Sequence, residues 1–168
     1  GSPTEKRNKV SELAQTDSKA ALEIARSIAD PWFKSQSLSA VARFMPGSPM
    51  EIIAESVQTA KQCKEYYHQT AVRTWEIAAL AQRGLVAEAK ESVSSVLKEV
   101  DLVTPAASQS EALYLILNAS FDLGPDVAAA IVDKLKMLCG NDHHWRCKRA
   151  IKNAEKILSG EMKPREFY

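Results

Sequence analysis

The chain has 168 residues, of which 45% are hydrophobic, so it is long enough for the core of one domain and too short for two ordinary ones. Its formal net charge of +1 provides no overall field to attract nucleic acid or an anionic membrane, and its 6 glycines are too few for a turn-rich β fold. The three cysteines, Cys63, Cys139 and Cys147, form no CxxC pair, which favours reduced thiols in the cytoplasm over a disulfide framework.

No segment approaches the roughly 18 consecutive apolar residues that a transmembrane helix needs, so we expect no membrane partner. No signal peptide is recognisable. The chain begins with Gly1-Ser2 instead of Met, which is typical of residues left by cleavage of a tag. We therefore expect that the natural protein either extends further upstream or has lost a leader.

Helix-starting residues precede helical apolar patterns in the first part of the chain. A leading helix is predicted over about 4–14, and a second from Asp17 or Ser18 to about residue 29. Asp30-Pro31 then starts a third helix, because the carboxylate accepts hydrogen bonds from free backbone N–H groups and proline needs no partner at the first helical position.

The next helices follow similar signals. Ser48 and Glu51 have the spacing of a capping box, and the helix that they start is followed by another over 66–83, which Gly84 is expected to end. Residues 86–100 carry the cleanest helical stripe of the chain.

Three more start signals divide the C-terminal part. Thr104-Pro105 and Gly124-Pro125 each begin a helix, and Asn141 or Asp142 is expected to cap the last one. The apolar stripe of the last helix contains Cys147, Ala150, Ile151, Ala154, Ile157 and Leu158. No segment has the period of two that a strand requires.

The predicted helices pair as four hairpins and leave a patternless tail over 160–168. The hairpins cover about 18–45, 49–83, 86–123 and 125–159. Anchoring the second helix of each at Leu38, Ala71, Leu113 and Cys147 gives spacings of about 33, 42 and 34 residues, which lie in the range of helical repeats. Neighbouring hairpins are expected to stack because one hairpin alone cannot bury both of its apolar faces. A compact bundle of the same helices is the alternative.

The first hairpin resembles the degenerate α-α repeats of bacterial helical-repeat proteins, which are similar to HEAT and tetratricopeptide arrays. The resemblance is carried by the stretch ALEIARSIADP at 21–31, followed by Leu38-x-x-Val41-Ala42. The Trp, Leu-Gly and Tyr positions of the tetratricopeptide motif are absent, and only the apolar spacing extends to the other hairpins. The resemblance implies an all-α fold, a right-handed α-α superhelix of about four hairpins plus a leading helix, and a habit of binding proteins. It carries no catalytic residues.

Aromatic residues gather near the start of the second helix in three hairpins. These clusters are Trp32-Phe33, Tyr66-Tyr67-His68 and His143-His144-Trp145. In a stack they would share one edge, where rigid amphipathic rings could form a ridge for a partner. The alternative interpretation is that the rings close the turns and pack against the neighbouring hairpin.

Two cysteines and two histidines fall within 139–147, a combination that occurs in zinc sites. The spacing argues against such a site, because Cys147 lies on the apolar stripe of its helix and the adjacent His143 and His144 point in different directions. We therefore expect no metal or other cofactor.

The last helix is basic. Only Glu155 opposes its positive residues, which are Arg146, Lys148, Arg149, Lys152 and Lys156. Such a helix could contact phosphates. The alternative is a solvated cap for the end of a stack, and the mixed charge of the rest of the chain disfavours a continuous nucleic-acid track.

The sequence therefore predicts a non-catalytic module that binds another protein or peptide. No Gly-rich phosphate loop, HExxH motif or nucleophile elbow is present, so no catalytic residue is predicted. The predicted partner-binding residues are Trp32, Phe33, Tyr67, His68, Trp145, Arg146 and Arg149. The alternatives are a nucleic-acid binder that uses the last helix, and a zinc-binding or enzymatic domain around 139–147.

Overall fold

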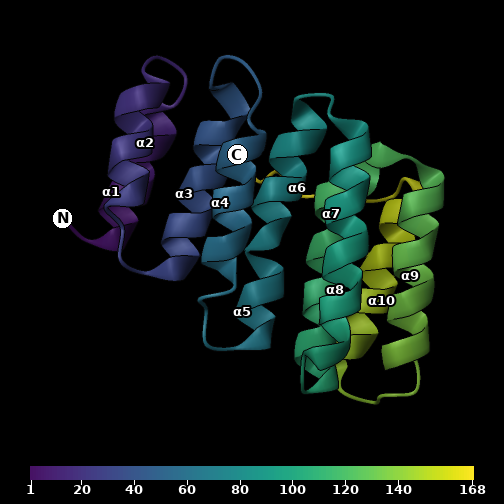
Figure 1. Ribbon diagram of the computed structural model, residues 1–168. Helices are drawn as coiled ribbons and strands as arrows, with labels where there is room; N and C mark the ends of the chain where they lie inside the picture. Colours follow the sequence, from purple (N-terminus) through teal and green to yellow (C-terminus); the bar gives the residue numbers. More distant parts are fainter.

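The computed structural model describes residues 1–168 as helices joined by short connections, with 75% helix and no strand (Figure 1). The predicted all-α class is confirmed. The α-helices are α1 (Pro3–Leu13), α2 (Ser18–Arg26), α3 (Pro31–Phe44), α4 (Met50–Ala60), α5 (Tyr66–Ala71), α6 (Arg73–Gln82), α7 (Val86–Glu99), α8 (Ala106–Ser120), α9 (Pro125–Cys139) and α10 (Trp145–Ser159). Short 3-10 turns, η1 (Val100–Leu102) and η2 (Phe121–Leu123), continue α7 and α8.

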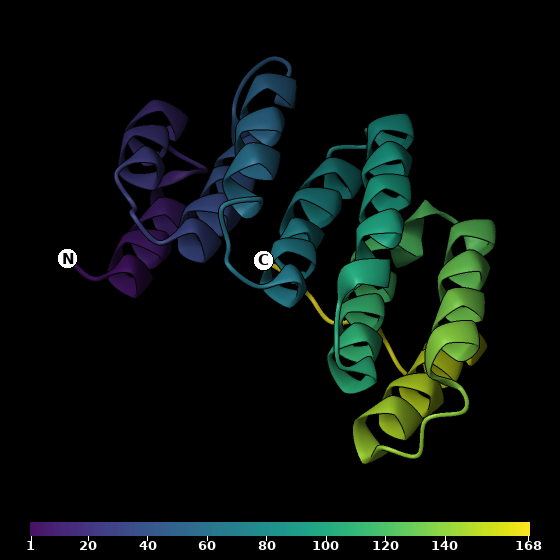
Figure 2. The same cartoon turned by 60° about the horizontal axis from the view of Figure 1, so that its bottom comes forward.

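The helices lie in two layers. The first layer contains α1, α3, α6, α8 and α10, and each of these contacts the next along the row. The other layer contains α2, α4, α7 and α9, each packed against the preceding helix of the first layer (Figures 1 and 2). The contact of α3 is wider with α4 than with α2, and that of α8 is wider with α9 than with α7, whereas the predicted hairpins paired α2 with α3 and α7 with α8. Apolar periodicity does not distinguish these groupings, because each helix touches both of its chain neighbours.

Two of the predicted start signals form as expected. Asp30 Oδ1 accepts hydrogen bonds from the backbone N–H groups of Trp32 and Phe33, at 2.9 and 3.3 Å. Asp17 Oδ1 accepts one from the N–H of Ala20 at 3.0 Å. These bonds satisfy donors that the first turn of a helix leaves free, so they define where α2 and α3 begin.

Two other start signals differ from the prediction. Ser48 Oγ accepts a hydrogen bond from the Met50 N–H at 3.3 Å, but Glu51 makes no return bond, so the capping box is not formed. The cap of α10 is His144, whose Nδ1 accepts from the Arg146 N–H at 3.1 Å. Asp142 bonds instead to the His144 N–H at 2.8 Å, one step before the helix begins.

The single helix predicted over 66–83 is interrupted at Val72, between α5 and α6. The Thr70 hydroxyl donates to the carbonyl groups of Tyr66 and Tyr67, at 3.1 and 2.9 Å, and the Thr74 hydroxyl donates to that of Ala71 at 2.5 Å. Such bonds compete with the helical ladder and bend helices. The interruption matters for the site below because α5 contacts α8.

One cluster of buried apolar side chains extends along the whole row, from Val10 in α1 to Ile157 in α10. The predicted stripes supply most of it. Val86 and Leu158 are exceptions, each 42% exposed, because each lies in a terminal turn of its helix, at the edge of the packed layers. No helix combines the length and the apolar character that crossing a bilayer would require.

Candidate functional site

The residues predicted to contact a partner come from α3, α5 and α10, and most of them line two adjoining clefts. Trp32, Phe33, Tyr67 and His68 line the first, here named the aromatic cleft, which has a volume of about 800 Å³. Its other lining residues are Asp30, Pro31, Gln62, Cys63, Lys64 and Glu65.

The second cleft, here named the arginine cleft, has a volume of about 430 Å³ and is lined by Tyr67, Arg146 and Arg149 together with residues that were not predicted. Tyr67 is therefore common to both clefts. Trp145 lines neither of them and is 57% exposed.

The rings of the aromatic cleft also pack against one another. The Trp32 ring meets those of His68 and Trp75 edge-on, with centroids 5.6 Å apart in both pairs. His68 Nδ1 lies 3.7 Å from the Glu65 carboxylate, and burial raises the pKa of the nearby Cys63 thiol. These contacts fit the packing interpretation for Trp32, while the cleft beside it leaves room for another molecule.

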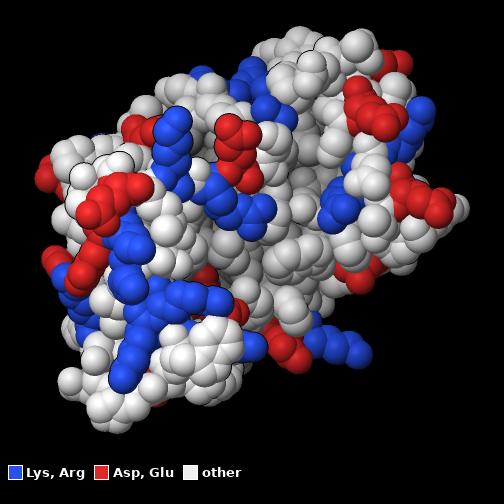
Figure 3. All heavy atoms as spheres, turned by 180° about the vertical axis from the view of Figure 1, so that it is seen from behind, with Lys and Arg blue, Asp and Glu red and all other residues white.

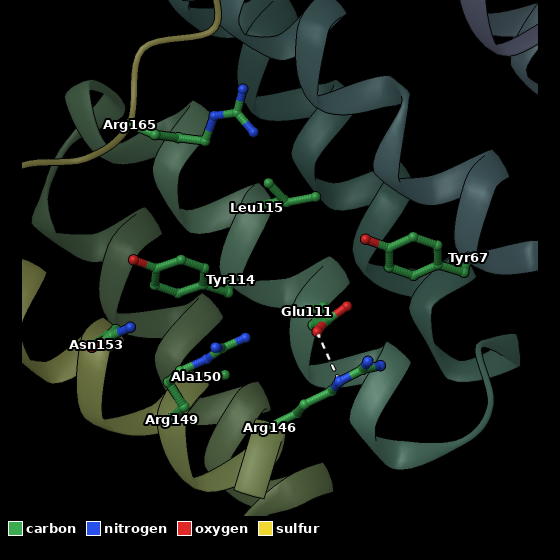
Figure 4. A pocket seen from close by; sticks show the side chains of 9 residues that line it. All are labelled: Tyr67, Glu111, Tyr114, Leu115, Arg146, Arg149, Ala150, Asn153 and Arg165. Carbon is green, nitrogen blue, oxygen red and sulfur yellow. Dashed lines mark ion pairs between the residues drawn. The ribbon is translucent and has the colours of Figure 1, made fainter.

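The walls of the arginine cleft come from three helices and from the C-terminal segment (Figure 4). Tyr67 of α5 forms one side. The lining residues that the sequence did not predict are Glu111, Tyr114 and Leu115 of α8, Ala150 and Asn153 of α10, and Arg165 of the segment after α10. No motif could have grouped them, because α5, α8 and α10 are distant in the chain and meet only through packing.

Positive charge exceeds negative charge in the arginine cleft. Arg146 Nε lies 3.5 Å from Glu111 Oε1, but neither Arg149 nor Arg165 has a carboxylate within ion-pair distance. The Arg149 guanidinium lies 4.6 Å from the centroid of the Trp145 ring, a cation–π contact that leaves its N–H donors free. Figure 3 shows Lys and Arg side chains gathered over the α10 end of this face.

Two tyrosine hydroxyls belong to the cleft. The pKa of Tyr67 is raised, chiefly by burial and then by the Glu111 carboxylate, against the opposing effect of Arg146. Its hydroxyl is thus a neutral donor, and it has no hydrogen-bond partner within the chain. The Tyr114 hydroxyl donates weakly to Met162 Sδ, at 3.5 Å.

The C-terminal segment, residues 161–168, runs back from α10 along the first layer to α6 (Figures 1 and 2). The Arg165 backbone N–H donates to Asn118 Oδ1 at 2.7 Å, and this bond holds Arg165 beside the cleft. The Trp75 indole N–H donates to the Phe167 carbonyl at 3.2 Å, and the two rings meet edge-on.

Tyr168, the last residue of this segment, is partly buried. The Arg43 guanidinium lies 4.1 Å from the centroid of the Tyr168 ring, and the Tyr168 hydroxyl donates to the Trp75 carbonyl at 2.7 Å. Burial raises the pKa of Tyr168, with Arg43 opposing that effect. The segment is thus held by its backbone and by both aromatic side chains.

Residues 139–147 do not converge on one point. The thiols of Cys139 and Cys147 are buried, whereas His143 and His144 are exposed. Burial and the neighbouring Cys147 raise the pKa of the Cys139 thiol to about 12. Nowhere in the chain do three His, Cys, Asp or Glu side chains lie together in an arrangement that could hold a metal ion.

A charged pair is buried between α6 and α7, away from both clefts. Arg73 Nε lies 2.6 Å from Glu76 Oε1, and the two side chains are 4% and 1% exposed. Ser92 donates to Glu76 at 2.9 Å, and Arg73 donates to Ser95 at 3.0 Å. These bonds satisfy the buried charges and join the two layers.

Comparison of the chain with models of known protein families, with curated protein sequences and with solved structures finds no significant match. The clefts and the C-terminal segment are therefore the features from which a function can be inferred.

Proposed function

We propose that this protein is a non-catalytic module that binds an extended segment of another protein along its first layer. The observation that carries the proposal is the position of the chain's own C-terminal segment, which crosses α8 and reaches α6 without forming a helix. A surface that holds one extended segment by its backbone and its aromatic side chains has the chemistry needed to hold another.

The contacts explain why the surface suits this role. Asn118 and Trp75 bond to backbone groups, which every polypeptide offers at regular intervals. Aromatic rings and arginine side chains then surround Phe167 and Tyr168. Large rings buried among other rings are the side chains that most often dominate binding energy between proteins.

The two clefts extend this surface beyond the C-terminal segment. They adjoin at Tyr67, so a partner segment that entered the arginine cleft could continue into the aromatic cleft. In this proposal Trp32, Phe33, Tyr67, His68, Arg146 and Arg149 contact the partner inside the clefts, and Trp145 contacts it at the rim.

We also propose that the row of helices is a short right-handed α-α superhelix with the clefts on its inner side. Support comes from the first layer, in which every helix contacts the next, whereas successive helices of the other layer have few or no contacts. Small-angle X-ray scattering tests the elongation: a compact domain of this length should have a radius of gyration of about 15 Å, and we expect a larger value.

A peptide library displayed on phage and selected against the protein tests the function. We expect selected peptides to lose about 30-fold or more in affinity for Tyr67→Ala, because Tyr67 is common to both clefts. The matched control is Met137→Ala in α9, which removes a 72% exposed side chain from the other layer. Failure to select any binder, or equal losses for the two variants, would contradict the proposal.

A further inference from the structure

We infer that the arginine cleft binds an extended partner segment that carries two acidic side chains two positions apart. This inference rests on the proposed function and deepens it by naming the chemistry of the partner. It follows from the number of cations in the cleft and from their positions.

The cleft holds more positive charge than the chain itself neutralises. Three guanidinium groups face one carboxylate, that of Glu111, which pairs with Arg146. The Arg149 guanidinium lies 4.6 Å from the centroid of the Trp145 ring, and that of Arg165 lies 4.6 Å from the centroid of the Phe167 ring. Arg165 Nε also donates to the Glu166 carbonyl at 3.4 Å, which leaves its two terminal nitrogens as donors. A guanidinium group stacked on a ring keeps in-plane N–H donors available for a carboxylate, which two parallel hydrogen bonds can hold.

The positions of these two arginines favour separate acidic groups over a single compact anion. Arg149 rises from α10 at one side of the cleft, and Arg165 reaches it from the C-terminal segment at the other, with Tyr114 and Leu115 between them (Figure 4). An acidic side chain can pair with each arginine. In an extended segment, acidic side chains two positions apart point to the same face, so both can enter the cleft while the residue between them points away from it.

Other groups of the cleft agree with this assignment. The Tyr67 hydroxyl is a donor without a partner in the chain, and it would serve a carboxylate. Glu111 carries negative charge into the same space, so it would repel a phosphate dianion more than a carboxylate. The cleft therefore fits a pair of carboxylates better than it fits a phosphate.

The arrangement also assigns a positioning role to Asn118. This buried side chain donates from Nδ2 to the Tyr114 carbonyl at 2.7 Å and accepts from the Arg165 N–H at 2.7 Å. It thereby fixes the Arg165 backbone against α8. Loss of the Asn118 side chain should weaken acidic-segment binding through Arg165 without removing any charge.

Fluorescence anisotropy with a labelled Gly-Glu-Leu-Glu-Gly peptide tests the inference. We expect saturable binding with a dissociation constant below about 1 mM at low ionic strength, and none for the Gly-Gln-Leu-Gln-Gly peptide. Arg149→Gln and Arg165→Gln should each weaken binding by about tenfold or more, because each removes a charge-assisted hydrogen-bonded pair. Arg149→Lys should recover only part of the affinity, because lysine lacks the planar fork.

Matched controls separate this effect from general attraction. Lys148→Gln and Lys152→Gln remove the same charge from exposed positions of α10 outside both clefts, and binding should stay within about twofold of the original. Equal losses for Lys152→Gln and Arg149→Gln would overturn the inference. So would tighter binding of a phosphotyrosine peptide or of single-stranded RNA than of the acidic peptide.

The outcome also separates the two proposals. Peptides selected from the library that depend on Tyr67 but are indifferent to Arg149→Gln and Arg165→Gln would remove the acidic-segment inference and leave the proposed function intact. Acidic peptides that bind and lose affinity with both arginine variants would support both.

Discussion

The Tyr168 hydroxyl donates a hydrogen bond of 2.7 Å to the backbone carbonyl of Trp75, and the Trp75 indole N–H donates one of 3.2 Å to the carbonyl of Phe167. This reciprocal pair joins the end of the chain to the middle of the row of helices. It fixes the C-terminal segment beside the clefts in which we propose that a partner lies.

Replacement of Tyr168 by Phe tests the attachment. The variant keeps the ring and removes one hydrogen bond from a largely buried acceptor, so the free energy of unfolding in urea should fall by about 1 kcal/mol. The matched control is Tyr66→Phe, because the Tyr66 ring is exposed and its hydroxyl makes no hydrogen bond within the chain. An equal effect of the two substitutions would show that the Tyr168 bond contributes nothing.

The free energy of unfolding should fall more when one member of the buried Arg73–Glu76 pair is replaced than when both are replaced. Arg73→Met leaves the Glu76 carboxyl without its cation in the interior and should cost about 3–5 kcal/mol in chemical denaturation. Glu76→Leu should cost less, because Arg73 Nη1 still lies 3.5 Å from the Glu99 carboxylate. The double variant Arg73→Met with Glu76→Leu should recover most of that loss, since apolar replacements of similar volume are often neutral or stabilising. A double variant as unstable as the sum of the single ones would refute this account.

The ionisation of Glu76 should make the stability of the protein depend on pH. Burial raises its pKa in the folded protein, and Arg73 only partly opposes this effect. A raised carboxyl pKa favours folding while the group is protonated, so the contribution is fully present below the unfolded value of about 4.5 and is lost as the pH rises through the folded pKa. The free energy of unfolding of the original protein minus that of Glu76→Gln should therefore decrease as the pH rises from about 4. A constant or increasing difference would contradict the predicted direction.

Trp32 and Trp145 distinguish packing from partner contact. Trp32 packs against Trp75 and His68, so Trp32→Ala should lower the free energy of unfolding by about 2 kcal/mol, below the usual cost for a fully buried ring. Trp145 is mostly exposed, and Trp145→Ala should change stability by no more than about 0.5 kcal/mol. Thermal melting of both variants is the measurement, and a large effect of Trp145→Ala would mean that its ring is structural.

The cysteine thiols should resist modification in the folded protein. All three are buried, and at pH 8 a pKa of about 12 leaves roughly one Cys139 in 10,000 as the reactive thiolate. A chromogenic disulfide reagent should therefore label few thiols in native buffer and all three in guanidinium chloride. Rapid native labelling of Cys139 would show that the thiol is accessible or that its pKa is lower.

The helices of this protein could be predicted because their signals are local. Asp17 and Asp30 cap α2 and α3 as expected, and the apolar spacing places Cys147 on the inward side of α10. A cap acts within one turn and a stripe repeats along one helix, so both are readable from neighbouring residues. The aromatic residues near the helix starts were also visible as neighbours in the sequence. They include Tyr67, which lines both clefts.

The clefts and the buried charges could not be predicted from the sequence, because they depend on contacts between distant parts of the chain. The sequence carries no signal that Arg73 and Glu76 are buried, because only α7 brings Ser92 and Ser95 near enough to bond them in the interior. The tail over 160–168 showed no pattern of its own, because an extended segment needs no periodicity when other helices supply its hydrogen-bond partners. The amino-acid sequence by itself determined an all-helical protein with its turns and inward faces, through interactions that span one or two helical turns. Only the tertiary structure decided that Arg165, Arg149 and Tyr67 share one cleft, since this depends on how α5, α8, α10 and the C-terminal segment pack together.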